Sequence, residues 1–223
     1  MTAPLLPRSM KMDPAAVAKY KQTMACYMPL EAVDEVFDFF NRYSVHFHIT
    51  RERHSKLGDY RWPQRDHNFH EISVNGNLNK YYFLLVLLHE MAHLNCHQRF
   101  GCEVLPHGHE WQEEYRQLLL QYRSIFPPEV AVLIDQYTRR IPLSRTLANK
   151  IEAQLRSYDE GYNPSDDLTL DQLPEGSLFR LQQRPEQLFW SVEKRRTRWL
   201  CEDAQTRMQY LIRGSAQVVK VDN

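Results

Sequence analysis

The sequence has no excess charge of either sign and no long apolar run. Lysine plus arginine and aspartate plus glutamate both number 28, so the formal net charge is zero at pH 7. A basic field over the whole protein is therefore excluded, and any contact with a nucleic acid must come from a local patch. The longest apolar run, residues 81–88, is far too short to cross a membrane.

Cysteine is also scarce. Cys26, Cys96, Cys102 and Cys201 form neither a CxxC pair nor a regular spacing. Residues 1–12 contain no apolar stretch long enough for a secretion signal. We therefore expect reduced thiols, a cytoplasmic protein and no membrane partner.

Hydrophobic residues make up 43% of the chain, which is enough for a real core. Helical spacing and capping residues predict helices at about 13–27, from 29 onward, and at about 79–100, 109–124 and 128–140. Alternating or β-prone residues predict strands near 45–51, 57–62 and 69–74. The fold class is therefore α+β, with helices and a short antiparallel sheet.

The chain is expected to have three parts. Residues 1–145 would form the main domain, residues 146–167 a helical and polar linker, and residues 168–223 a small β-rich module. The module is small enough to rely on its neighbour for stability. Its strands are expected at 178–181, 188–201 and 208–221.

The most apolar predicted helix contains the sequence HEMAH at residues 89–93, an HExxH motif. Residues four apart share a helix face, so His89 and His93 can present their imidazoles to one metal ion. Zinc lowers the pKa of bound water to about 7, and a nearby carboxylate can take the proton as the water attacks a carbonyl. Glu90 is placed for that role, so the motif predicts a zinc ion with Glu90 as general base.

Three other histidines compete to be the third ligand. His97 lies eight residues after the first histidine of the motif, about 12 Å along a helix, which is too far for ligands held about 2.1 Å from one zinc. His107 and His109 lie in the segment PHGHEW at residues 106–111, and spacing does not separate them. Gly108 between them would let the backbone approach the metal closely.

HEMAH followed after about a dozen residues by PHGHEW resembles the SprT/Spartan family of zinc metallopeptidases. The resemblance covers about residues 30–140 and maps the third ligand to His107, with His109 on a variable position. It implies a minimal zincin-like fold, one zinc ion per chain and endopeptidase activity. In Spartan-like members the substrates are proteins crosslinked to DNA, and activity is linked to DNA binding.

The sequence departs from the family beyond this region. Many bacterial members end in a cysteine-ligated zinc ribbon, but only Cys201 lies beyond Cys102 here, so no ribbon can form. Dependence on DNA is therefore left open, whereas the peptidase motif matches at each key position. The alternative is a non-catalytic module, stabilised by zinc, that binds a nucleic acid or a protein. Glu90 argues against it, because a structural site needs four protein ligands and no such carboxylate.

One basic cluster, KRRTRW at residues 194–199, invites a nucleic-acid interpretation. On a strand, Lys194, Arg196 and Arg198 would project together beside Trp190 or Trp199, and this combination suits a single-stranded nucleic acid or a phosphate backbone. The alternative is a solvated strand face with edge-protecting charges. A second basic group near the predicted sheet would line a substrate cleft, contact DNA or simply cover a hairpin: Arg51, Arg53, Lys56 and Arg61.

Overall fold

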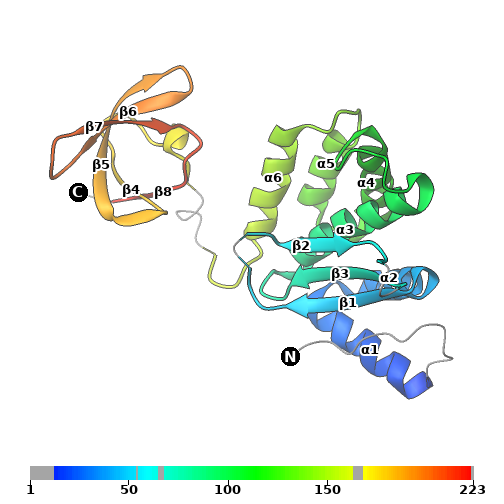
Figure 1. Cartoon of the computed structure of the whole chain (residues 1–223). Coiled ribbons are helices and arrows are strands. Elements are labelled where there is room, and N and C mark those ends of the chain that lie inside the picture. Colours follow the sequence, from blue (N-terminus) through cyan, green and yellow to red (C-terminus); the bar gives the residue numbers. More distant parts are fainter. Residues whose placement is uncertain (1–12, 54, 65–67, 163–167, 222–223) are drawn as a thin grey trace. The chain divides into compact units, whose positions relative to one another are not determined.

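The computed structural model describes residues 13–53, 55–64, 68–162 and 168–221 (Figure 1). The chain divides into two compact units, Met1–Asp159 and Glu160–Asn223, and each has its own hydrophobic core. Residues 1–12, on which the expectation about a secretion signal rests, lie outside the described residues. In the described part of the chain, no helix is long and apolar enough to cross a membrane.

The first unit combines helices with a small sheet, which confirms the α+β class. The five predicted helices form close to their expected positions. Helix α1, for example, begins where the Asp13 side chain accepts from the Ala15 N–H and Pro14 takes the first position. The helices are α1 (Pro14–Tyr27), α2 (Leu30–Tyr43), α3 (Lys80–Phe100), α4 (His109–Tyr122), α5 (Pro128–Tyr137) and α6 (Arg145–Arg156), with a 3-10 helix η1 (Arg123–Ile125) after α4.

The sheet contains β1 (Val45–Thr50), β2 (Gly58–Arg61) and β3 (His70–Asn75) in the order β1-β3-β2. β2 is antiparallel to β3, but β1 is parallel to it, so the prediction of an antiparallel sheet was wrong for β1. The cause is the connection 51–57, which carries the chain past the end of β3. The most buried strand, β3, thereby takes the centre and β2 becomes an edge.

Helix α3 is the centre of the first unit. Its residues 82–88 are all buried, and it packs against β2 and β3 as well as α4 and α6. The Asn79 side chain caps its first turn by accepting from the Tyr82 N–H at 3.0 Å, and Gly101 ends it with a φ of 70° that favours glycine. The helix therefore holds the HExxH motif on a rigid, buried element.

Helix α6 lies in the segment that the sequence analysis assigns to a linker. Ile151 and Leu155 are buried in the core of the first unit, and the Asn79 side chain donates to the Leu155 carbonyl at 2.8 Å. These contacts attach α6 to the first unit. Residues 163–167 of the expected linker lie outside the described residues.

The second unit is a five-stranded antiparallel sheet in the order β7-β6-β5-β4-β8. Its small core centres on Phe179, Phe189 and Trp199. The predicted strand at 188–201 contains a turn, and the predicted strand at 208–221 is two strands. The elements are η3 (Leu170–Gln172), β4 (Leu178–Leu181), β5 (Arg184–Arg195), β6 (Arg198–Asp203), β7 (Gln209–Arg213) and β8 (Val218–Lys220).

Candidate metal centre

Three histidine side chains converge between α3 and the start of α4. His89 and His93 lie one turn apart on α3, and His107 belongs to the loop that precedes α4. The Nε2 atoms are 3.3 Å apart for His89 and His93, 3.2 Å for His93 and His107, and 3.1 Å for His107 and His89. Three imidazole nitrogens at these distances can direct their lone pairs at one cation.

This triangle fits a zinc ion. Nitrogen ligands about 2.0–2.1 Å from a tetrahedral zinc are about 3.3–3.4 Å from one another, close to the distances found here. In the part of the chain that the structure describes, no fourth His, Cys, Asp or Glu joins the group. Three protein ligands are typical of catalytic zinc sites, whereas structural sites use four. The group can hold a metal ion, and the number of ligands favours a catalytic one.

The three imidazoles are neutral at neutral pH. Burial lowers the pKa of His89 to about 3, with smaller contributions from His93 and His107. Burial and then His107 lower the pKa of His93 to about 4, and burial also lowers the pKa of His107. Neutral imidazole is the form that binds metal ions, so the group does not have to lose protons to do so.

The loop before α4 holds His107 in an unusual backbone conformation. Its φ of 59° lies in the left-handed region, which few residues other than glycine adopt. The Gly108 N–H donates to the Leu105 carbonyl at 2.9 Å, and the Gln112 side chain donates to the His107 carbonyl at 3.0 Å. A Cβ on Gly108 would lie 2.9 Å from the same Leu105 oxygen, so the turn requires glycine. Backbone strain that surrounding contacts maintain is often found at functional sites.

Trp111 packs against all three histidines. Its ring centroid lies 4.6 Å from that of His89, 5.1 Å from that of His93 and 4.6 Å from that of His107. The indole is buried, so it fixes the imidazole rings from the side of α4 and excludes water there. Sequence reasoning did not assign Trp111 to the site, and the only signal for it was its place in PHGHEW.

Glu90 lies beside the histidine triangle and is buried against β2. A Cβ built on Gly58 would lie 2.4 Å from Glu90 Oε1, so the carboxyl group rests on the bare backbone of that strand. Burial, with a smaller contribution from Asp59, raises the pKa of Glu90 to about 8, while Arg53 and Lys56 oppose the shift. A cation held by the histidines favours the ionised carboxylate. Such a buried carboxyl group in a cleft is suited to proton transfer.

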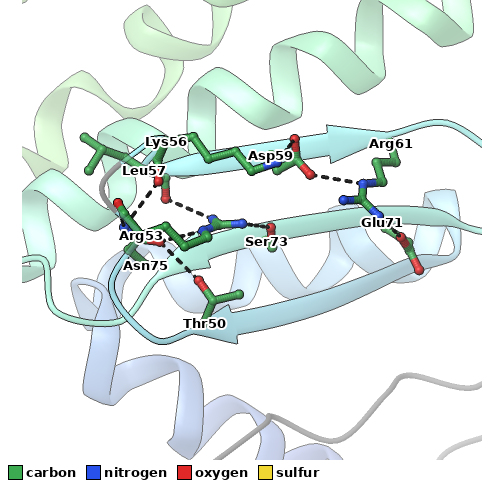
Figure 2. Close-up of polar contacts among 9 residues, drawn as sticks. All are labelled: Thr50, Arg53, Lys56, Leu57, Asp59, Arg61, Glu71, Ser73 and Asn75. Atoms are coloured by element: carbon green, nitrogen blue, oxygen red, sulfur yellow. Dashed lines mark hydrogen bonds and ion pairs between the residues drawn. The ribbon is translucent and has the colours of Figure 1, made fainter.

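A hydrogen-bond network fixes the connection 51–57 and thereby the position of β2 (Figure 2). The Asn75 side chain is fully buried and donates to the carbonyls of Arg53 and Lys56 at 3.1 and 3.3 Å. The Arg53 guanidinium donates to the Asn75 side chain at 2.8 Å and to Ser73 Oγ at 3.0 Å. The connection is therefore tied to β3, and Gly58 follows directly after it.

The same contacts show what most of the basic residues near the sheet do. Arg53 is bonded within the network, and Asp59 pairs with both Lys56 at 2.8 Å and Arg61 at 3.1 Å. Arg51 is exposed. Most of this group therefore positions β2 (Figure 2), a role that its sequence pattern did not reveal.

Tyr60, on the edge strand β2, joins the metal centre to a second polar cluster. Its ring is parallel to that of His93, with centroids 6.3 Å apart, and its hydroxyl lies 2.9 Å from His70 Nδ1. Gln98 Nε2 is 2.7 Å from His70 Nε2. Because the amide nitrogen can only donate, His70 accepts at Nε2 and donates from Nδ1 to the Tyr60 oxygen. Tyr60 and Gly58 are both site residues that sequence reasoning missed.

Two cavities meet at the metal centre. The larger, of about 420 Å³, is lined by the three histidines, Glu90 and a partly apolar wall in which Trp62 and Leu105 are 49% and 77% exposed. The smaller, of about 300 Å³, extends from His89 and Glu90 toward α6. Gly58, His89 and Glu90 line both cavities.

The other histidine candidates lie outside the triangle. His97 contacts the Trp62 ring, with centroids 6.1 Å apart, and Cys102 Sγ at 3.7 Å, on a wall of the larger cavity. His109 begins α4 and is exposed. The geometry therefore selects His107, which spacing alone did not distinguish from His109.

The basic cluster of the second unit forms a hairpin and not one strand. β5 ends at Arg195, β6 begins at Arg198, and Arg196 lies in the turn with a φ of 26°. The expectation that Lys194, Arg196 and Arg198 share one strand face was therefore wrong, because alternation does not continue through a turn.

Trp199 is also placed differently from the expected stacking platform. It is 4% exposed, and its Nε1 donates to Asp171 at 2.8 Å. Lys194 pairs with the same carboxylate at 3.0 Å. Trp199 is thus a core residue of the second unit, whereas residues 194–198 are exposed.

The fold and the site together define a class of protein. A buried helix carries two histidines and a glutamate as HExxH, and a third histidine comes from the start of the next helix, inside an α+β domain: this is a metallopeptidase-like arrangement. Residues 28–130 match the SprT-like family, so the chain carries an SprT-like domain, as the resemblance predicted. The match ends within α5 and does not reach α6. No curated protein and no solved structure matches the chain.

Proposed function

We propose that the SprT-like domain is a zinc-dependent endopeptidase of minimal zincin-like fold. His89, His93 and His107 hold one zinc ion, and Glu90 is the general base. The observation that carries the proposal is the triangle of Nε2 atoms, 3.1–3.3 Å apart, beside a buried carboxyl group. Neither feature alone would support it: the triangle gives a metal site, and Glu90 gives it a proton acceptor.

A zinc ion in the triangle supplies a Lewis acid that lowers the pKa of water to about 7. Glu90 accepts a proton from the attacking water, whose oxygen bonds to the peptide carbonyl carbon. The C–N bond then breaks, and Glu90 passes the proton to the leaving nitrogen, so one water is consumed for each bond cleaved. Trp111 excludes other water from the side of α4.

The edge strand β2 offers a place for the substrate. Within the described residues it pairs only with β3, and its residues Gly58 and Tyr60 line the larger cavity. An extended peptide that adds to this edge runs past Glu90, with backbone hydrogen bonds that require no particular sequence.

The family resemblance supports substrates that are bound or crosslinked to DNA. The purified, zinc-loaded chain should be incubated with a DNA-binding protein, with and without single-stranded DNA, beside Glu90→Gln. We expect cleavage that a chelator abolishes, that zinc restores and that the variant lacks while it retains zinc. A requirement for DNA would support the crosslink substrates. Zinc binding without cleavage under any of these conditions would favour the non-catalytic module.

A further inference from the structure

The smaller cavity borders the catalytic groups and ends on a helix that the family match does not include. Gly58, His89 and Glu90 line both this cavity and the larger one, so a side chain next to the reacting bond can enter it. Its remaining walls come from the connection to β2 and from α3, α4 and α6: Lys56, Leu57, Tyr82, Leu85, Val86, Tyr115 and Glu152.

The walls of the cavity are apolar and its far side is polar. Leu85 and Val86 are buried residues of α3. Tyr82 and Tyr115 are buried as well, and the Tyr82 hydroxyl lies 3.5 Å from a Glu152 carboxylate oxygen. The Glu152 charge also acts on Tyr115, where it helps burial to raise the pKa. A long side chain in this cavity can thus contact apolar walls and a carboxylate.

Glu152 gives the part of the cavity next to α6 a negative charge. The one basic lining residue of the lysine or arginine type, Lys56, is already paired with Asp59 at 2.8 Å. Arg156, one turn further along α6, does not line the cavity, whereas Glu152 does. A positively charged group that enters the cavity can therefore meet the Glu152 carboxylate.

We propose that this cavity binds a lysine or arginine side chain of the substrate next to the bond that is cleaved, with Glu152 as its counter-ion. This specificity rests on the proposed peptidase function and deepens it. The methylene stem of a basic side chain packs on the apolar walls while its charged head meets the carboxylate. An apolar side chain of the same length would desolvate Glu152 without compensation. Glu152 lies outside residues 28–130, the part of the chain that matches the SprT-like family.

The test compares peptides that are identical except for lysine or norleucine beside the bond cleaved, at a site first mapped by mass spectrometry in an unfolded protein. For the unmodified protein, kcat/KM is expected to be higher for lysine. In Glu152→Gln the lysine-to-norleucine ratio of kcat/KM should fall about tenfold. Glu152→Asp keeps the charge and should retain the preference. Glu31→Gln removes an exposed carboxylate on α2 and should leave the ratio unchanged.

Peptide binding provides a second readout that does not require hydrolysis. Zinc-loaded Glu90→Gln protein should bind the lysine peptide about tenfold more tightly than the norleucine peptide, and the added Glu152→Gln change should remove the difference. Equal cleavage and equal binding of the two peptides would overturn the specificity and leave the peptidase function standing. A binding preference without any cleavage by the unmodified protein would overturn the peptidase function and support the cavity assignment.

Discussion

Glu90 and Gly58 approach each other so closely that only a glycine fits on β2 at this point. The nearest atom to an added Cβ is the Glu90 carboxyl oxygen at 2.4 Å, followed by a Val86 side-chain carbon at 2.8 Å. A methyl group must therefore move the proposed general base, the strand or both. None of the three histidines contributes one of the three atoms nearest to the added Cβ.

Gly58→Ala should consequently separate metal binding from catalysis. We expect kcat/KM for peptide cleavage to fall by about 10- to 100-fold, because a displacement of about 1 Å in a catalytic group has effects of this size. Zinc content should remain at one ion per chain. Thermal unfolding of the same sample will show whether the fold is retained, and unchanged cleavage by a folded variant would contradict the placement of Glu90 against β2.

His70 gives a prediction about pH. It is 4% exposed, and burial, followed by His97, lowers its pKa to about 4, whereas an unfolded histidine titrates near about 6.5. Between these values the unfolded chain binds the additional proton. The contribution of neutral His70 to stability is therefore complete above about pH 6.5 and is lost as the pH falls toward about 4.

The measurement is urea unfolding of the metal-free protein and of His70→Gln from pH 4.5 to 7.5. The slope of unfolding free energy against pH should be lower in the variant, by up to about 1.4 kcal/mol per pH unit. Comparing slopes removes the loss of the Tyr60 contact, because that loss is the same at every pH. Parallel curves would show that His70 is not held neutral.

At the scale of elements, the helices were predictable because their signals are local. Asp13 and Pro14 mark the start of α1, and Gly101 marks the end of α3. The order of the sheet was not predictable in this way, since the parallel pairing of β1 with β3 depends on the path of residues 51–57. Helix α6 was assigned to a linker because few of its positions are apolar, and its burial depends on contacts with distant segments.

Some residues of the candidate site were likewise predictable from local sequence signals, and others were not. His89, Glu90 and His93 were predictable because one helix carries them at a fixed spacing. His107 required the family resemblance, because spacing left His109 equally eligible. Gly58 could not be assigned from sequence, since its contact with Glu90 exists only once β2 lies against α3.

The network around Asn75 makes β2 dependent on one buried side chain (Figure 2). Asn75→Ala leaves the carbonyls of Arg53 and Lys56 without their donor and should lower the free energy of unfolding by about 2–3 kcal/mol. Asn77→Ala, at an exposed position nearby, is the matched control and should stay within about 0.5 kcal/mol. Chemical denaturation measures both, and equal stability of the two variants would show that the network does not anchor the strand.

At the scale of the whole molecule, the residues of the candidate site all lie in the first unit. The three histidines, Glu90, both cavities and Glu152 all lie before residue 160. The second unit has its own core and an exposed basic hairpin at residues 194–198. Trp199 is buried and is not a stacking platform, so a contact between this hairpin and a nucleic acid would rest on its charges and weaken as salt is raised.

The most direct test of the metal centre compares His107→Ala with His109→Ala. Zinc affinity and cleavage of one peptide are measured in both, beside the unmodified protein. His107→Ala should lose more than about 100-fold in zinc affinity, because even loss of an outer-shell partner costs 10- to 100-fold, and cleavage should disappear with the metal. His109→Ala should retain one zinc ion per chain and full activity. Retention of zinc and cleavage by His107→Ala would contradict the three-histidine centre on which the proposed function rests.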